Sequence, residues 1–313
     1  MRIAIVGAGG VGGYFGARLA AAGADVRLVA RGAHLAAIRE RGLRVHSVRG
    51  DVHADVGATE DASRIGASDV VLFCVKSFDT DEAAARHLPH LVGDDTFVVS
   101  LQNGIDNEER IAAVVGHSRV VGGLALIFSA ISEPGVIAHS GGPARLVFGE
   151  FDGVMTERVG RLRAWCTKAA VEAEVSGDIR AALWHKYAFI CAQAGTTAAI
   201  RLALGEIRDT PESWGLFRRL LEEAYAVARA TGVAIPATAV DERLTFAEGL
   251  EPGTFSSLHH DLVGGKRMEL EALHGTLVRL AHQHGVGAPA SETVYALLKP
   301  WAVRNERAPT PSA

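Results

Sequence analysis

The chain has 313 residues, more than one hydrophobic core usually supports, and 48% of them are hydrophobic, so we expect two domains. A formal net charge of −4 provides no basic field for DNA or RNA, and we expect no nucleic-acid partner. No apolar run approaches the roughly 18 residues of a membrane helix. Met1-Arg2 leads straight into an apolar run rather than a signal peptide, so we predict a cytoplasmic protein without a membrane partner.

The first two dozen residues predict a strand, a glycine-rich turn and a helix. The apolar run 2–6 is followed by Gly7-Ala8-Gly9-Gly10-Val11-Gly12 and then by an alanine-rich stretch over 14–22. Glycines at this spacing permit a tight turn, close approach of backbone N–H groups to a pyrophosphate, and close packing of the helix on the strand. We therefore predict that these six residues bind a dinucleotide. A tight turn without a ligand is the alternative.

The second strand, predicted over 25–29, indicates which nicotinamide cofactor binds. NAD sites usually carry an acidic residue at the end of this strand, where it accepts a hydrogen bond from the ribose 2′-hydroxyl. Here the strand leads into Ala30-Arg31-Gly32, and Asp25 stands at its other end. The guanidinium of Arg31 can form charge-assisted hydrogen bonds to a 2′-phosphate, so we predict NADP. An arginine in a solvated loop is the alternative.

Strands and helices continue to alternate through the first half, which predicts a parallel, doubly wound sheet. Strands over 70–75 and 96–100 flank a helix over 79–88. Lys76 and Asn103 follow these two strands, at the carboxyl ends where open α/β sheets bind ligands. Lys76 could contact a phosphate or ribose of the cofactor, and Asn103 could orient the nicotinamide or a substrate carbonyl. For both, a plain turn residue is the alternative.

A change in pattern marks the end of the first domain. Short apolar runs separated by glycine and proline predict antiparallel strands added to an edge of the sheet; they cover 120–128, 135–139 and 145–148. A helix over 156–169 and a strand over 171–175 follow. We predict a Rossmann-type α/β domain over residues 1–177 and an all-helical domain over residues 178–313. Its helices are expected over 179–199, 211–231, 238–248, 267–284 and 291–305.

Two charged residues of the helical half are candidates for catalysis. Lys186 stands in a helix that is apolar on most of its circumference, on one face with Ile190, Gln193 and Ala194. Desolvation lowers the pKa of an ammonium and would make Lys186 a better proton donor near neutral pH. A lysine that extends along the helix to water is the alternative. Glu269 borders the apolar face of its own helix and could pair with Lys186, hold a substrate hydroxyl, or face solvent.

A serine and two histidines precede Glu269. Ser257 could donate a hydrogen bond to a substrate carboxylate. His259 and His260 are neighbours in the sequence and have no further ligands at a suitable spacing. The three cysteines lie in apolar segments without metal-ligand spacing. We therefore predict no metal site.

The ordered combination of these motifs resembles the ketopantoate reductase (2-dehydropantoate 2-reductase) family over about residues 1–289. The resemblance implies an NADP-binding Rossmann domain, an all-helical domain, and NADPH-dependent reduction of the carbonyl of a 2-oxo acid in pantothenate biosynthesis. The motifs that carry it are residues 7–12, Arg31, Cys74-Val75-Lys76, Leu101-Gln102-Asn103-Gly104, Leu183-Trp184-His185-Lys186, Ser256-Ser257-Leu258-His259-His260-Asp261 and Lys266-Arg267-Met268-Glu269-Leu270.

The resemblance also implies a role for each site residue. Lys186 would be the general acid that protonates the carbonyl oxygen as hydride arrives, and Glu269 would hold the substrate and position this lysine. Ser257 would bind the substrate carboxylate, and Asn103 would help to place both cofactor and substrate. NADP would be held by residues 7–12, Arg31 and Lys76.

The chain departs from the family's pattern where the substrate is selected. Ile190 and Ala194 stand four and eight residues after Lys186, where the family usually has asparagines, and Leu204 replaces another. His274-Gly275 stands in place of the family's usual Asn-Gly. A site that hydrogen-bonds a substrate hydroxyl discriminates strongly, whereas an apolar wall does so weakly. We hypothesise that the substrate is 2-dehydropantoate or a different, less polar 2-oxo acid or related carbonyl compound.

Two other functions stay open at this point. A regulatory protein that senses NADP(H) without turnover would keep the glycine loop and Arg31, but it would need neither Lys186 nor Glu269. An opine-type or imine-reducing dehydrogenase would share the cofactor domain and a helical partner domain. The apolar helical half allows a homodimer without requiring one.

Overall fold

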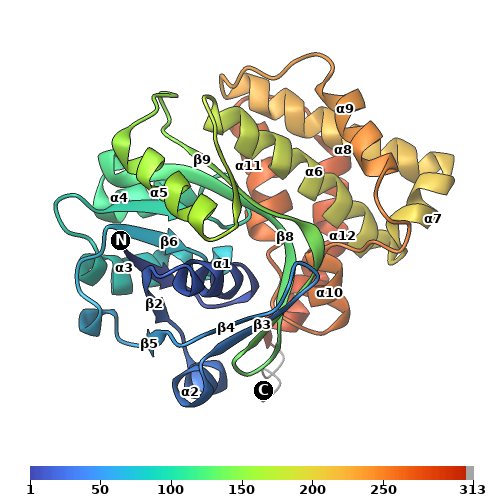
Figure 1. Ribbon diagram of the computed structural model, residues 1–313. Helices are drawn as coiled ribbons and strands as arrows, with labels where there is room; N and C mark the ends of the chain where they lie inside the picture. The colour runs from blue at the N-terminus through green and yellow to red at the C-terminus, as the bar shows by residue number, and fades with distance from the viewer. Residues whose placement is uncertain (308–313) are drawn as a thin grey trace. The chain divides into compact units, whose positions relative to one another are not determined.

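The computed structural model describes residues 1–307, which form two compact units, Met1–Ile179 and a second that begins at Arg180 (Figure 1). The first unit is built on a sheet, and the second consists of helices. The predicted fold class, a Rossmann-type α/β domain followed by an all-helical domain, is confirmed. We predicted a domain boundary after residue 177, and the structure divides into its two compact units after residue 179. The roles predicted for the two domains stay predictions, and residues 308–313 of the predicted second domain lie outside the described residues.

A sheet of ten strands forms the centre of the first unit. Its order is β4-β3-β9-β8-β7-β6-β1-β2-β5, and β10 also pairs with β9. The neighbours β7, β6, β1 and β2 are parallel to one another. The strands are β1 (Arg2–Val6), β2 (Asp25–Val29), β3 (Leu43–Ser47), β4 (Val52–Ala54), β5 (Gly57–Thr59), β6 (Val70–Phe73), β7 (Phe97–Ser100), β8 (Val120–Glu133), β9 (Val136–Gly149) and β10 (Glu172–Val175).

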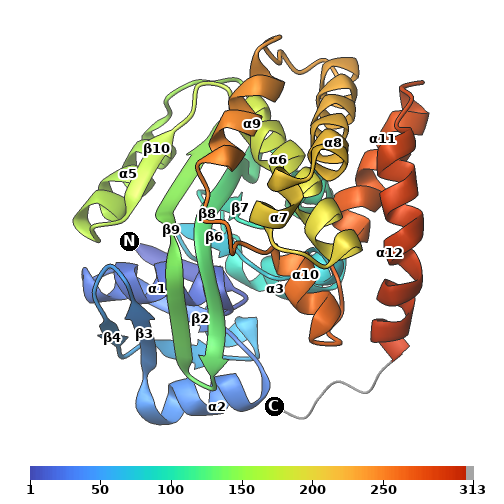
Figure 2. The ribbon, with the colours of Figure 1, turned by 90° about the vertical axis from the view of Figure 1, so that its right-hand side faces the viewer.

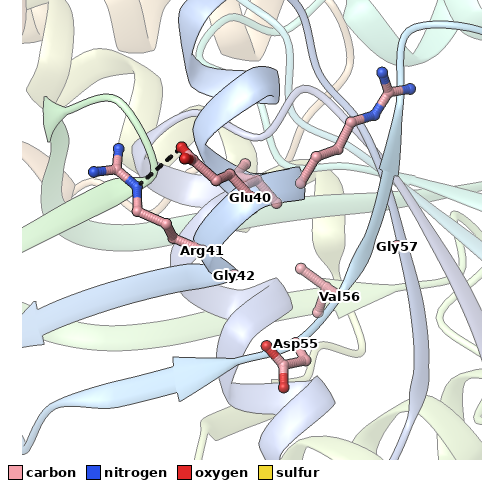
Figure 3. Close-up of a pocket in the computed structure, with 8 residues that line it drawn as sticks. Glu40, Arg41, Gly42, Asp55, Val56 and Gly57 are labelled. Carbon is pink, nitrogen blue, oxygen red and sulfur yellow. Dashed lines mark ion pairs between the residues drawn. The ribbon is translucent and has the colours of Figure 1, made fainter.

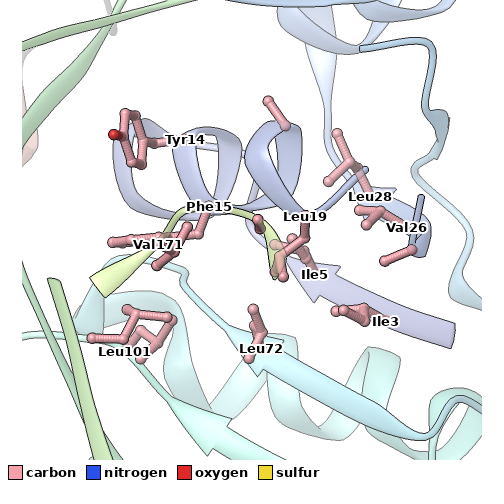
Figure 4. Close-up of a cluster of buried hydrophobic side chains, with 14 of the residues drawn as sticks. Ile3, Ile5, Tyr14, Phe15, Leu19, Val26, Leu28, Leu72, Leu101 and Val171 are labelled. Carbon is pink, nitrogen blue, oxygen red and sulfur yellow. The ribbon is translucent and has the colours of Figure 1, made fainter. Parts of the chain in front are cut away.

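Helices cover both faces of this sheet because successive side chains of its strands point to opposite sides. Ile3 and Ile5 are buried in a cluster with Phe15 and Leu19 of α1 (Figure 4), to which side chains of α5 also belong. Ala4 and Val6 are buried in a second cluster with side chains of α3 and α4. The helices are α1 (Gly10–Ala21), α2 (Gly32–Arg41), α3 (Thr80–Leu91), α4 (Asn107–Val115) and α5 (Glu157–Lys168), with 3-10 turns η1 (Ala62–Arg64), η2 (Ser77–Asp79) and η3 (His117–Arg119).

The predicted antiparallel pairing over residues 120–148 is confirmed, but the prediction of three short strands at the sheet edge is wrong. The region forms two strands of 14 residues, β8 and β9, which lie side by side as an antiparallel pair (Figure 2). They are not at the edge, because β8 pairs with β7 and β9 pairs with β3 and β10. The register jumps from Leu126↔Arg145 to Phe128↔Gly141, so the Gly-Pro segment bulges out of β9 without ending it.

The second unit is helical, and α6 is buried along much of its length. Residues 191–198 of α6 are all buried, as expected for a helix that is apolar on most sides. Around it, α8 packs on α7, α9, α11 and α12. The helices are α6 (Ile179–Ile200), α7 (Leu204–Asp209), α8 (Pro211–Ala230), α9 (Ala239–Glu248), α10 (Ser257–Val263), α11 (Thr276–Gln283) and α12 (Pro289–Arg307). Among residues 1–307, no helix has both the length and the hydropathy of a membrane span.

The single helix predicted over 267–284 is also wrong in its first half. Residues 266–269 are irregular, and a π-helical turn, η4 (Glu271–Gly275), precedes α11. In this turn the Gly275 N–H donates to the Leu270 carbonyl at 3.0 Å, an i→i+5 bond. A π-helical turn shifts the helical periodicity, and such turns occur frequently at functional sites. Glu269 therefore lies just before the turn rather than on a regular helix.

Candidate active site

The glycine loop (residues 7–12) between β1 and α1 is closed tightly at its first and last glycines. Gly7 has a φ of +99°, a conformation that favours glycine, and a Cβ added there would lie 2.8 Å from the Val75 nitrogen. A Cβ at Gly12 would lie 2.1 Å from the Gly7 carbonyl oxygen and 2.9 Å from the side chain of Ile5. Steric demand of the turn and of helix packing accounts for these two glycines.

The second glycine of the motif, Gly9, is open instead. Apart from its neighbours in the chain, no heavy atom of the described residues would lie within 4 Å of a Cβ added at Gly9. Gly9 is the N-cap of α1 and has no side chain with which to bond the first backbone N–H groups of this helix. These N–H groups and the helix dipole suit an anion. The open side of Gly9 therefore fits the pyrophosphate of a dinucleotide, and the individual contacts predicted for the loop stay predictions.

The predicted residues of the first unit share one edge of the sheet. Adjacent parallel strands in the order β7-β6-β1-β2 lead into Asn103, Lys76, the glycine loop and Arg31. Because parallel strands end on the same side, their carboxyl ends form one rim. Lys76 is exposed on this rim, and Asn103 is partly buried. The structure thus brings together the four positions that were predicted to bind the cofactor.

Arg31 pairs with an acidic residue that the sequence pattern did not reveal. Its Nη2 lies 3.2 Å from Oδ2 of Asp79, and the Arg31 side chain is 80% exposed while that of Asp79 is 22% exposed. Asp79 ends the 3-10 turn that follows Lys76. Since 48 residues separate the partners, only the nearness of Asp79 to a strand end could have suggested it. Asp79 partly balances the charge that Arg31 offers to a phosphate.

A hydrogen-bond network joins the loops that follow β6 and β7. The Ser77 hydroxyl donates to the Asn103 carbonyl at 2.6 Å, and this carbonyl also accepts from Nδ2 of Asn107 at 2.9 Å. The Thr80 hydroxyl donates to Oδ1 of Asn107 at 3.0 Å and accepts from Nε2 of Gln102 at 2.7 Å. The network fixes the backbone of Asn103, so its side-chain amide is presented from a rigid position.

His34, which the sequence reasoning missed, fastens the glycine loop to the turn between β8 and β9. Its Nε2 lies 2.9 Å from the Ala8 carbonyl oxygen, and its Nδ1 accepts from the Gly135 N–H at 3.0 Å. Both bonds form only when the ring is neutral with its proton on Nε2. Burial lowers the pKa of His34, which favours the neutral ring. Nothing in the local pattern identifies His34, because Gly135 is 101 residues away.

Lys186 lies on α6 between two residues that fix the orientation of this helix. Nδ1 of His185 is 2.9 Å from the Tyr225 hydroxyl on α8, and the Tyr187 hydroxyl donates to the carbonyl of Leu273. Consecutive side chains on a helix point about 100° apart, so anchoring both neighbours sets the direction of the Lys186 side chain. Lys186 itself is partly buried. Its predicted role as a proton donor stays a prediction.

Glu269 is held next to the same part of α6. Glu269 is only 6% exposed, and its backbone carbonyl accepts a hydrogen bond from the Leu273 N–H at 3.2 Å. Leu273 is also the acceptor of the Tyr187 hydroxyl, so the segment that carries Glu269 is tied to α6 beside Lys186. Burying a carboxylate is costly unless it is used or paired. The structure therefore brings Lys186 and Glu269 onto neighbouring segments.

The two serines at the start of α10 have different surroundings. Ser257 is exposed and is the first residue of the helix, and its predicted carboxylate contact stays a prediction. Ser256 is buried, caps the helix by accepting from the His259 N–H at 3.1 Å, and lies 2.8 Å from the Thr197 hydroxyl on α6. Ser256 thus fastens α10 to α6. Serine ahead of an apolar run is a helix N-cap signal that could have found it.

His274, in the π-helical turn, is a buried residue packed on α6. A Cβ added at Gly195 would lie 2.8 Å from its Nε2. Within residues 1–307 neither ring nitrogen makes a hydrogen bond of good geometry. Burial lowers the pKa of His274 to about 4, and a loose contact with the Cys191 backbone offsets only part of that effect. His274 is therefore neutral at physiological pH.

A hollow of the first unit lies apart from these residues. It has a volume of about 440 Å³ and adjoins the C-terminal end of α2, whereas Arg31 precedes the other end. Figure 3 shows the ion pair between Glu40 and Arg41 beside it, with 3.7 Å between the charged atoms. No predicted site residue lines it. Its lining residues are Ile38, Arg39, Glu40, Arg41, Gly42, Asp55, Val56 and Gly57.

Comparison with known proteins decides the family. The family model "Ketopantoate reductase PanE/ApbA" matches residues 3–153, and the model of the family's C-terminal domain matches residues 178–302. The chain belongs to the ketopantoate reductase family. A 2-dehydropantoate 2-reductase of Mesorhizobium japonicum is 34% identical to it, over 97% of this chain and 98% of that one. The uncharacterized oxidoreductase YkpB of Bacillus subtilis is 32% identical, over 96% and 98%.

A solved structure agrees with this family. The PanE/ApbA family ketopantoate reductase from Ralstonia eutropha superimposes with a TM-score of 0.90 at 34% identity, covering 98% of this chain and 100% of that chain. Ketopantoate reductases are NADPH-dependent oxidoreductases that act on a carbonyl group, so the predicted family, enzyme class and cofactor are confirmed. The cytoplasmic location and the homodimer stay predictions.

Proposed function

We propose that the protein reduces the carbonyl group of a 2-oxo acid with NADPH and that Lys186 is the general acid. Family membership over both domains supports the class of reaction. The observation that carries the proposal for Lys186 is its place on α6, between anchored neighbours and beside the segment of the buried Glu269. A partly buried lysine and a buried glutamate on segments that are bonded to each other form an arrangement suited to proton transfer.

In this proposal the side chains of the protein donate one proton and bind the 2-oxo acid. Bound NADPH supplies the hydride. Lys186 would donate a proton from Nζ to the substrate oxygen as negative charge develops there, and Glu269 would accept a hydrogen bond that keeps the ammonium in place. Ser257 would donate to the substrate carboxylate, and the amide of Asn103 would orient the substrate next to the cofactor.

The cofactor is proposed to lie along the edge formed by β7, β6, β1 and β2. The uncapped end of α1 and the open side of Gly9 would receive the pyrophosphate. Arg31 would bind the 2′-phosphate in competition with Asp79, and Lys76 would add a second positive charge. In this proposal the first domain binds NADPH and the second supplies the proton donor.

The substrate is proposed to be 2-dehydropantoate, as a step of pantothenate biosynthesis, or a related and less polar 2-oxo acid. Relatives named 2-dehydropantoate 2-reductase support the first. Apolar residues where the family's pattern has asparagines favour the second, since Ala194 is 1% exposed, Leu204 is 0% exposed, and Ile190 is partly buried. These two candidate substrates differ in whether they carry a hydroxyl group for the site to bind.

The test is NADPH oxidation against a panel of 2-oxo acids and imines, with NADH as the control cofactor. Strong turnover of 2-dehydropantoate would support the first substrate, and turnover of an aliphatic or aromatic 2-oxo acid alone would support the second. Turnover of imines alone would replace the proposal with an opine-type dehydrogenase. Tight NADPH binding without any turnover would replace it with a sensor protein.

A further inference from the structure

We infer that Gln193 determines substrate specificity: its side-chain amide binds a hydrogen-bonding group on the part of the substrate beyond the carbonyl that is reduced. The inference rests on the proposed function, because it takes Lys186 to be the residue next to that carbonyl. It assigns a polar side chain, such as one with a hydroxyl, to the preferred 2-oxo acid.

The side chain of Gln193 is buried and incompletely bonded. The residue is 6% exposed, and within residues 1–307 its Nε2 has no hydrogen-bond partner. Buried amides in native proteins are nearly always bonded, and leaving one unpaired costs about 1–3 kcal/mol. The backbone carbonyl of Gln193, in contrast, accepts from the Thr197 hydroxyl at 2.7 Å. The side-chain nitrogen is therefore a donor that something outside the chain can satisfy.

Helix geometry places Gln193 nearly in line with Lys186. A separation of seven residues on α6 turns the two side chains about 20° from each other and sets them about 10 Å apart along the helix axis. Ile190 lies between them on the same face and is partly buried. A substrate whose carbonyl lies at Lys186 and whose chain runs over Ile190 reaches Gln193.

A second unsatisfied polar atom occurs close to the same end of this face. Thr197, one turn beyond Gln193, bonds to Ser256 at 2.8 Å, and Ser256 accepts from the backbone N–H of His259 at 3.1 Å. His259 is 8% exposed, yet within the described part of the chain its Nδ1 has no partner. Gln193 is one turn from Thr197, and His259 is about one turn from Ser256, so both unpaired nitrogens belong to residues close to the bonded Thr197 and Ser256 hydroxyls. Two unpaired nitrogens near one place indicate that a polar group of a ligand binds there.

The imidazole of His259 is suited to bind an uncharged group of a ligand. Burial lowers the pKa of His259, and the charges of His260 and Arg201 lower it further. The ring of His259 stacks on Phe255 with 4.2 Å between centroids, which holds it in one orientation. A neutral imidazole and a neutral amide suit a hydroxyl, which can both donate and accept.

The experiment compares two 2-oxo acids that differ by one hydroxyl, 2-dehydropantoate and its deoxy analogue 3,3-dimethyl-2-oxobutanoate. Gln193→Leu removes the amide with a small change in volume. We expect kcat/KM for 2-dehydropantoate to fall about 10- to 100-fold, the range for one hydrogen bond to a buried group, and kcat/KM for the analogue to change less than about threefold. Gln283→Leu, the same change at an exposed position of α11, should alter neither value.

An equal decrease in kcat/KM for both substrates would assign Gln193 a structural role and overturn the inference. Unchanged kcat/KM for both would also overturn it, because the amide would then contact only water. If Gln193→Leu does not fold, Gln193→Asn keeps the amide on a shorter chain and must still lose activity selectively with 2-dehydropantoate. Wild-type protein that prefers the deoxy analogue overturns this inference alone. Absence of wild-type turnover with both acids, and with the rest of the panel, is the separate failure of the proposed function.

Discussion

The two units of the molecule assemble their candidate residues in different ways. In the first unit the glycine loop, Arg31, Lys76 and Asn103 share an edge because adjacent parallel strands end there. In the second, the segment that carries Glu269 is joined to α6 by contacts that include the Tyr187–Leu273 hydrogen bond and the packing of His274 against Gly195. The first arrangement follows from strand order, and the second depends on particular contacts between helices.

This difference indicates how each region should respond to mutation. Several strand ends would contribute to NADPH binding, so removing one contact should weaken affinity only in part. One side chain would donate the proton, so its removal should affect turnover much more strongly. Substitutions in the two regions test this contrast.

Lys186→Ala should reduce kcat about 10²- to 10⁴-fold, the usual contribution of a general acid, and leave the Kd for NADPH unchanged. Steady-state kinetics with the best substrate of the panel and NADPH fluorescence titration measure the two effects. Lys266→Ala, an exposed lysine of the same unit, is the control and should retain wild-type turnover. Near-full activity of the Lys186 variant would show that the proton comes from elsewhere.

His274 should make the protein less stable in acid. Because its folded pKa of about 4 lies below its usual 6.5, the unfolded state takes up the proton first as the pH falls. The stabilisation by neutral His274 is complete above about pH 6.5 and is lost toward pH 4, by up to about 3 kcal/mol. Urea unfolding of the wild type and of His274→Asn at pH 7 and pH 5 measures it.

The His274 variant should show a smaller decrease in the free energy of unfolding between the two pH values than the wild type. His282→Asn serves as the control, because it makes the same change at a histidine whose side chain is 65% exposed. Identical slopes for the wild type and His274→Asn would mean that the buried ring is not the group that titrates.

Arg31→Ala should raise the Kd for NADPH about 10- to 100-fold, because hydrogen bonds to a charged group are each worth about 1.5–3 kcal/mol. The Kd for NADH should change less than about threefold. Asp79→Asn is the matched opposite change: it removes the carboxylate that Arg31 contacts and should tighten NADPH binding. An equal effect of Arg31→Ala on both cofactors would refute the 2′-phosphate assignment.

His34→Ala should raise the Kd for NADPH severalfold and leave kcat at saturating NADPH unchanged. It removes the two bonds that hold Ala8 and Gly135 together, each worth about 0.5–1.5 kcal/mol. His117→Ala, at a histidine that is 77% exposed, is the control. A lower kcat with an unchanged Kd would place His34 in the chemistry instead of in the support of the glycine loop.

Local patterns predicted the elements whose boundaries depend on nearby residues. The second strand was predicted over 25–29 and is found at Asp25–Val29. The patterns failed where pairing at a distance decided the outcome: β9 continues past residues 142–144 because β8 pairs with it before and after them, β3 pairs with residues 136–139, and β10 pairs with residues 145–148. The short helices α2, α4, α7 and α10, each of ten residues or fewer, were also missed, since so few turns carry little periodic signal.

The same limit applies to the candidate site. Residue types and strand-end positions were sufficient to select Arg31, Lys76 and Asn103 as candidates, but beyond its nearness to a strand end nothing in the sequence indicated that Asp79 pairs with Arg31. Gln193 was recognised only as a residue on the face of Lys186. That its amide is buried without a partner depends on the residues packed around α6, which lie far away in the chain.

By itself the sequence determined the fold class and the glycine loop, because both follow from short-range spacing of apolar residues and glycines, and the resemblance of its ordered motifs indicated the family. The tertiary structure decided which distant groups meet: His34 with the glycine loop, Asp79 with Arg31, and the Glu269 segment with α6. These contacts join segments tens of residues apart, and only the packing of the folded chain brings such segments together.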